Sequence, residues 1–177
     1  MTDYDYIRDG NAIYVQNGIG TNTSRVLETE PGRFREREVV PADPRADLWN
    51  QYEFTGSAGR CVGLFDPRTG RPQAAAVNHL KPEWFAVDST VAPDLRLLAS
   101  RHGGVFDIVS RDTLDRRWIV RWERDTASGI YELYDRRTRR LTPLFESNPA
   151  LGELPLAPME GVIATARDGR PIPCYLT

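Results

Sequence analysis

The stretch RRWIVRWERDTASGIYELYDRR, residues 116–137, decides the fold. In its first half, Trp118, Val120 and Trp122 alternate with mostly charged side chains, which is the period of a strand with one buried face. A second strand, GIYELYDRR, follows a polar turn. VFDIVSRD (105–112) precedes the pair, and RRLTPLFES (139–147) follows it. Four short strands in succession match the size of one β-propeller blade, so we predict a four-stranded antiparallel sheet over 105–145.

The two tryptophans of this stretch have two interpretations. Trp118 and Trp122 could pack against an adjacent blade, or they could form an aromatic cage for a ligand. We favour packing, because large aromatic side chains on the apolar face of a strand usually contribute to a core.

A repeated turn extends the pattern toward the N-terminus. LFDPRTGRPQ (64–73) and LYDRRTRRLT (133–142) share an apolar-aromatic strand end, an Asp and a tight turn, and VLETEPGRFR (26–35) is a looser copy. Asp at a turn start accepts hydrogen bonds from the backbone ahead of it, and Gly supplies a positive φ where one is needed. The repetition favours a repeat architecture over three unrelated hairpins.

The other two units are less complete. The first contains NAIYVQN (11–17), TSRVLETE (23–30) and FREREVVP (34–41), and a fourth strand is either missing or lies in DYDYI (3–7). The middle unit contains strand patterns in RCVGLFDP (60–67) and PQAAAVNHL (72–80), and EWFAVD (83–88) is a candidate for a further strand.

One helix interrupts the strands. The stretch DSTVAPDLRLLASRHGG (88–104) offers Asp88, Ser89 and Thr90 as caps, a proline near the first turn, and a glycine pair at its end. We therefore predict a helix around 93–101. The fold class predicted for the whole chain is all-β: about three propeller blades with one inserted helix.

Composition excludes several classes of function. The chain has 177 residues, 40% hydrophobic and 27% charged, so a packed core is expected. A formal net charge of -2 argues against nucleic acid or an anionic membrane as partner. No apolar run is long enough to span a bilayer, and the polar, acidic N-terminus does not resemble a signal peptide. We favour a cytoplasmic location, although the compartment stays open if the natural N-terminus lies further upstream.

Catalytic motifs are absent from the sequence. His102-Gly103-Gly104 could form an oxyanion hole, but it follows a helix pattern, so we interpret it as a helix C-terminus with His102 in the last turn. His79 is expected at the surface or in packing, and GSAG (56–59) as a loop. Cys61 and Cys174 have no metal-ligand spacing. We assign no catalytic, cofactor-binding or metal-binding residue and expect no cofactor.

The final third of the chain resembles the serine peptidases of the prolyl oligopeptidase family. The motifs are YELYDR (131–136), a Pro-rich linker with LAPM (156–159), ARDG (166–169) and the closing YLT (175–177). In that family, a strand like the first ends the last propeller blade, and the remaining motifs lead through a linker into the first hairpin of an α/β-hydrolase domain. The segments from about Asp43 onward also resemble the family's late propeller region.

This resemblance implies a domain organisation. It implies a partial β-propeller over 1–145, a linker over 146–158 and the start of an α/β-hydrolase domain over 159–177. The family's Ser, His and Asp would lie beyond Thr177, so we expect a fragment that is inactive alone, from a parent peptidase acting on short peptides. The implied partners are those peptides and the missing hydrolase domain.

Two other functions stay open. The chain could be a non-enzymatic propeller that serves as a binding or scaffold module, or it could belong to an esterase with the same hydrolase fold. Residues 159–177 discriminate against the first of these, because an accessory propeller does not need a linker followed by such a hairpin.

Overall fold

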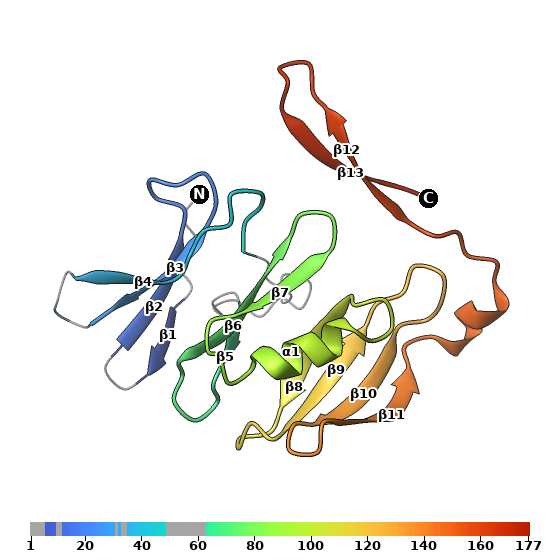
Figure 1. Ribbon diagram of the computed structural model, residues 1–177, viewed down its shortest axis with the longest axis horizontal. Helices are drawn as coiled ribbons and strands as arrows, with labels where there is room; N and C mark the ends of the chain where they lie inside the picture. The colour runs from blue at the N-terminus through green and yellow to red at the C-terminus, as the bar shows by residue number, and fades with distance from the viewer. Residues whose placement is uncertain (1–5, 10–11, 31, 33–34, 49–62) are drawn as a thin grey trace.

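Four antiparallel sheets and one α-helix make up the fold. The computed structural model describes residues 6–9, 12–30, 32, 35–48 and 63–177. Every strand in it pairs only with strands that are its neighbours in the chain. The first three sheets lie side by side in chain order, and the fourth, a hairpin, extends away from them (Figure 1).

The sheet predicted from residues 105–145 is confirmed. It consists of β8 (Phe106–Arg111), β9 (Arg117–Trp122), β10 (Ile130–Asp135) and β11 (Arg140–Glu146), in the order β11-β10-β9-β8. Trp118, Val120 and Trp122 are all fully buried on one face, as the alternation predicts. The register places Tyr134 opposite Trp118 and Glu132 opposite Val120, so a carboxylate shares the buried face.

The first sheet has the fourth strand that the sequence left in doubt. Its strands are β1 (Tyr6–Asp9), β2 (Ala12–Asn17), β3 (Arg25–Thr29) and β4 (Glu36–Val40), paired in chain order. β1 begins at Tyr6, inside the DYDYI stretch, and pairs with β2 from Tyr6 opposite Val15.

The middle sheet has three strands within the described residues. They are β5 (Leu64–Phe65), β6 (Pro72–Asn78) and β7 (Pro82–Ala86), again paired in chain order. The predicted strand in EWFAVD is therefore present. The predicted strand in RCVGLFDP is represented by only two residues, since residues 60–62 lie outside the described part of the chain.

Strand β6 is buried on both faces. Its four consecutive residues Ala74–Val77 are at most 1% exposed. Ala74 belongs to the apolar cluster shared with the β8–β11 sheet, whereas Ala75 and Val77 belong to the cluster shared with the β1–β4 sheet. The short alanine side chains let neighbouring sheets approach closely on either side, so the middle sheet lies between the other two.

The helix α1 spans Ala92–Ala99, slightly shorter than predicted. The predicted caps were wrong: the N-cap is Val91, which makes no side-chain capping bond. The Asp88 carboxylate instead accepts the Thr90 N–H at 2.8 Å, in a turn that precedes the helix. Asp88 therefore stabilises the turn before the helix and does not cap the first turn of the helix.

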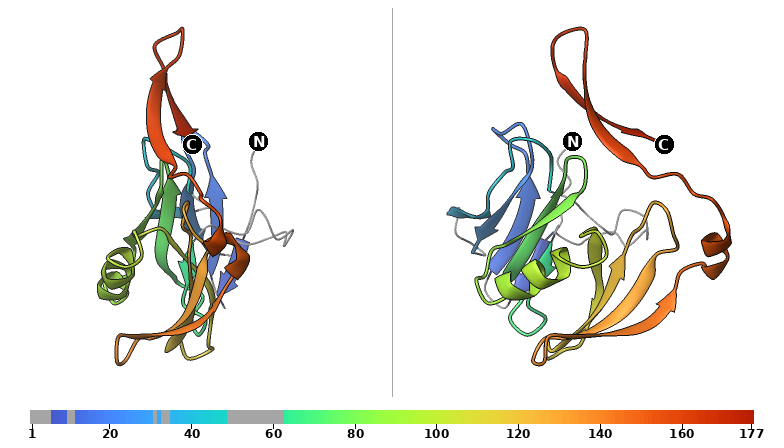
Figure 2. Two further views of the ribbon diagram at one scale, coloured as in Figure 1. Left: turned by 90° about the vertical axis from the view of Figure 1, so that its right-hand side faces the viewer. Right: turned by 45° about the vertical axis from the view of Figure 1, so that its right-hand side comes forward.

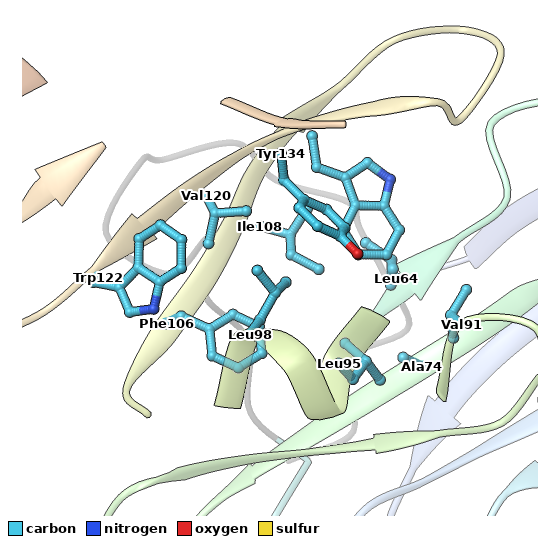
Figure 3. Packing of buried hydrophobic residues seen from close by; sticks show 11 residues of the cluster. Leu64, Ala74, Val91, Leu95, Leu98, Phe106, Ile108, Val120, Trp122 and Tyr134 are labelled. Atoms are coloured by element: carbon cyan, nitrogen blue, oxygen red, sulfur yellow. The ribbon is translucent and has the colours of Figure 1, made fainter. Parts of the chain in front are cut away.

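The larger core joins α1 to two sheets. Leu95 and Leu98 of the helix pack with Ile108, Val120 and other buried residues of the β8–β11 sheet, and with Leu64 and Ala74 of the middle sheet (Figure 3). Trp118 and Trp122 belong to this same cluster. The prediction that the two tryptophans pack between neighbouring sheets is therefore confirmed.

The closing hairpin pairs β12 (Glu160–Thr165) with β13 (Pro171–Leu176). An Asp-Gly pair such as Asp168-Gly169 predicts a two-residue hairpin turn, but the loop here is longer and that prediction is wrong. Ala166 and Arg170 are hydrogen-bonded, which leaves three residues between them, and Gly169 closes the turn with φ +84°. A turn followed by a left-handed Gly is the common geometry of three-residue hairpin loops.

The hairpin extends away from the sheets and contacts them at its base (Figure 2). A chain segment with a short 3-10 helix at Pro149–Glu153 connects it to β11, as the two turned views show (Figure 2). Most of its apolar side chains are exposed, and Leu176 retains 58% of its accessible surface. The hairpin therefore has little core of its own.

A substitution at Leu98 of α1 tests the larger core. Leu98→Ala should lower the free energy of unfolding by about 2–5 kcal/mol, because the side chain is fully buried between two sheets. Urea denaturation followed by tryptophan fluorescence measures this loss. Leu114→Ala makes the same chemical change at a side chain that is 52% exposed, and should change stability by less than about 0.5 kcal/mol. Equal losses in the two variants would contradict this assignment of the core.

Candidate functional site

A cleft of about 550 Å³ lies between the sheets and the closing hairpin. One wall is the β6–β7 turn (78–82), and others are the loop after α1 (102–105) and the β9–β10 turn (123–126). Met159, Gly161 and Tyr175 complete the lining from the hairpin. Apolar side chains and charged groups of both signs line it, and a concave site of this size is a natural candidate for ligand binding.

His102 lies in this cleft, but not where the sequence placed it. The helix ends at Ala99 with Ser100 as its cap, so His102 is beyond the last turn, in a left-handed conformation with φ +46°. Its Nε2 lies 3.1 Å from the Glu132 Oε2, and its ring meets the Trp122 ring edge-on at 4.9 Å between centroids. The helix-dipole explanation is therefore wrong, and Glu132 is the partner that matters.

Glu132 was missed by the sequence analysis. Its only signal was a carboxylate in the buried register of β10, with Tyr134 two residues further along the same face. The residue is 7% exposed, so His102 supplies the hydrogen bond that a buried carboxylate needs.

The glycine pair after His102 is used to turn the chain. Gly103 and Gly104 both have positive φ, and the Gly104 N–H donates to the Arg101 carbonyl at 2.7 Å. A Cβ on Gly104 would lie 2.7 Å from the Ala99 carbonyl oxygen, so only glycine fits there. The Gly104 N–H is thus already engaged in ending the helical segment.

A charged row leads from the cleft rim across the β8–β11 sheet. Arg121 pairs with Glu123, which lines the cleft, and its Nη2 lies 2.8 Å from the Asp107 Oδ2. Asp107 is 2% exposed. Burial raises the pKa of the Asp107 carboxyl to about 6, because the loss of hydration outweighs the attraction of Arg121.

The remaining sequence candidates do not join the cleft chemistry. Cys174 is a free thiol on β13, whereas Cys61 and the GSAG loop lie outside the described residues. His79 is a half-buried residue of the β6–β7 turn. In the part of the chain that the structure describes, no group of three His, Cys, Asp or Glu residues could hold a metal ion. Among the described residues, the hydrogen-bond partner of His102 is a carboxylate and not a hydroxyl or thiol that it could activate as a nucleophile.

Known proteins share the sequence and the fold of this chain over nearly its whole length. The chain is 32% identical over 169 residues to dipeptidyl aminopeptidase BIII of Pseudoxanthomonas mexicana, an alignment that covers 96% of this chain and 23% of the relative. The fold matches prolyl oligopeptidase B from Galerina marginata with a TM-score of 0.60 at 17% identity, over 99% of this chain and 23% of that one. The chain therefore resembles one segment of the serine peptidases of the prolyl oligopeptidase family.

A second solved structure supports the same fold. A prolyl endopeptidase, described in a study of inter-domain dynamics, matches with a TM-score of 0.62 at 15% identity, over 97% of this chain and 24% of that chain. No family model matches the chain. The chain spans about a quarter of the length of these prolyl oligopeptidase-family relatives. Among the described residues, no helix is both long and apolar enough to cross a membrane.

The raised pKa of Asp107 predicts a pH dependence of stability. Because the pKa is above the ordinary value of 3.8 in the folded chain, protonation favours folding. This contribution rises as the pH falls from about 6 toward 4 and is lost above that window; a shift of this size is worth about 3 kcal/mol. Asp107→Asn keeps a neutral side chain at every pH, so its stability relative to the natural chain should increase between pH 4 and pH 7.

Asp135 provides a control, because its pKa is shifted in the opposite direction from that of Asp107. Backbone and side-chain hydrogen bonds from Thr138 hold the pKa of Asp135 below its usual range. Asp135→Asn should therefore lose stability relative to the natural chain as the pH rises from 3 to 6. Thermal melts of all three chains across this pH range measure both effects. The Asp107 prediction would be contradicted if the stability difference between Asp107→Asn and the natural chain did not vary with pH.

Proposed function

We propose that the chain is part of a serine peptidase of the prolyl oligopeptidase family. The observation that carries this proposal is the alignment with a dipeptidyl aminopeptidase, which runs through nearly all of this chain but less than a quarter of the relative. In the proposed organisation, residues 1–145 form part of a β-propeller, 146–158 form a linker, and 159–177 form the first hairpin of an α/β-hydrolase domain.

The arrangement of the sheets supports the propeller part of the proposal. Each sheet is an antiparallel meander whose strands pair in chain order, and successive sheets share apolar clusters face to face. Sheets that repeat in this way around an axis form propeller blades. With four, three and four strands in the described residues, the three sheets correspond to about three blades.

The proposed chemistry belongs to the parent protein. There, a Ser would attack the peptide carbonyl, a His would take and return the proton, and an Asp would orient that His. The propeller would cover the active site and limit access to short peptides. The role of this chain is then to supply part of that cover and to begin the catalytic domain.

A non-enzymatic propeller module is the second candidate. It would use the three sheets as a binding scaffold and would need no catalytic domain. The hairpin argues against it: Ile163, Ile172 and Leu176 are each at least 45% exposed on a two-stranded sheet with both edges open. Such a hairpin is marginal by itself and suits further strands that would pair with it.

The chain alone should not react as a serine hydrolase. Incubation with a fluorophosphonate probe, and with chromogenic dipeptide and acyl-amino-acid substrates, should give no labelling and no turnover, because no Ser within the described residues is hydrogen-bonded to a His that could act as its base. An active serine hydrolase treated in parallel verifies the probe. Stoichiometric labelling of one Ser that His102→Ala or His79→Ala abolishes would overturn the proposed division of roles.

Removing the hairpin should improve solubility at little cost in stability. A chain truncated after Pro158 should melt within about 2 °C of the full chain and scatter less light at high concentration, because the deleted apolar side chains are mostly exposed. The double variant Ile163→Thr with Ile172→Thr keeps the hairpin but reduces its apolar surface, and should also scatter less. A sharp fall in melting temperature on truncation would mean that the hairpin belongs to a self-contained domain.

A further inference from the structure

The β9–β10 turn holds the linker at both of its ends. This turn runs from Glu123 to Gly129. The chain after β11 continues from Ser147 through the linker to Met159, the residue that precedes β12. At the start of the linker, the Ser147 N–H donates to the Gly129 carbonyl and the Asn148 N–H to the Ser128 Oγ, both at 2.8 Å. At its end, the Met159 N–H donates to the Asp125 Oδ2 at 2.7 Å.

The β9–β10 turn is stabilised internally, which fixes the groups that bind the linker. The Arg124 guanidinium donates through its Nε to the Ser128 carbonyl at 2.7 Å, which closes the turn on itself. Gly129 allows the close approach of the linker: a Cβ there would lie 3.0 Å from the Ser147 Oγ and 3.2 Å from the Trp122 carbonyl oxygen. One compact turn therefore presents three fixed acceptors to a segment that is otherwise mostly exposed.

The bond at the far end of the linker involves a charged acceptor. The Met159 N–H is the main cause that holds the pKa of Asp125 below its usual range, and Lys81 contributes by charge attraction. The base of the hairpin also meets Leu80, whose side chain lies against Gly161. Because Met159 and Gly161 line the cleft, whatever holds Met159 also sets the position of one cleft wall.

We propose that Asp125, Ser128 and Gly129 form a linker clamp that fixes the closing hairpin relative to the sheets. Asp125 is the latch of this clamp: its bond to the Met159 N–H holds the Met159 side of the cleft in position. Release of the Asp125–Met159 bond frees the hairpin end of the linker, whereas the Ser128 and Gly129 bonds still hold its start. The hairpin then pivots about the linker, and the cleft loses its Met159 side. This inference rests on the geometry of this chain and not on the peptidase proposal.

Spin-label distance measurements on the full chain test the latch. With Cys61→Ser and Cys174→Ser as background, nitroxides at Thr142→Cys on β11 and Thr165→Cys on β12 report the position of the hairpin; both sites are exposed. We expect one narrow distance distribution for this background. Adding Asp125→Ala should broaden the distribution at least two-fold, because the acceptor for the Met159 N–H is lost. Asp125→Asn retains a side-chain oxygen that accepts this N–H and should keep the narrow distribution.

A matched control separates the latch from general effects. Asp135→Ala removes a half-buried Asp at the neighbouring β10–β11 turn, where it bonds Thr138 and not the linker, and should leave the distribution narrow. Amide exchange of Met159, followed by NMR, should accelerate at least ten-fold in Asp125→Ala alone, with unchanged protection in β9 and β10. An equally narrow distribution in Asp125→Ala, or broadening in Asp125→Asn equal to that in Asp125→Ala, would overturn the proposal.

Discussion

The arrangement of the middle sheet, the helix and the β8–β11 sheet depends on one buried carboxylate. The Asp115 side chain is 1% exposed and accepts hydrogen bonds from Trp118 Nε1 at 2.7 Å and Gln73 Nε2 at 2.9 Å. Arg111 and Arg136 add two charged donors. These partners come from β6, β8, β9 and the end of β10, so a single carboxylate links two sheets. An isolated charge would be very costly to bury here, and the complete set of donors offsets that cost.

The network around Asp115 also includes the helix. Arg136 reaches Asp94 of α1 at 2.9 Å, and the Tyr134 hydroxyl donates to Asp94 at 2.7 Å. Two carboxylates and two guanidinium groups therefore balance inside a mostly buried cluster. Apolar packing alone would tolerate sliding between sheet and helix, because the hydrophobic effect is not directional. Hydrogen bonds of fixed length and direction select one register, so this network gives the neighbouring core its definite geometry.

Local pattern explains which parts of the fold could be predicted. Strand β9 followed from Trp118 and Trp122, because alternation within six residues depends only on the chain's own period. The N-cap at Val91 and the three-residue turn before Arg170 could not be read so directly, since several residues near each position had suitable turn chemistry. Asp115 and Glu132 were missed for a different reason. Their partners lie up to 42 residues away, and nothing in the local sequence separates a buried acid from a solvated one.

The two ends of strand β9 have separate structural roles. The Asp115 network lies beside the β8–β9 turn, and the cleft and linker contacts lie at the β9–β10 turn. A strand of six residues separates them by roughly 20 Å. Trp118 belongs to the network end, and Trp122 contacts His102 at the cleft end. The rigid network therefore holds the sheets together without occupying the edge where the cleft is lined. That edge remains open to a linker and a hairpin that the core itself does not bury.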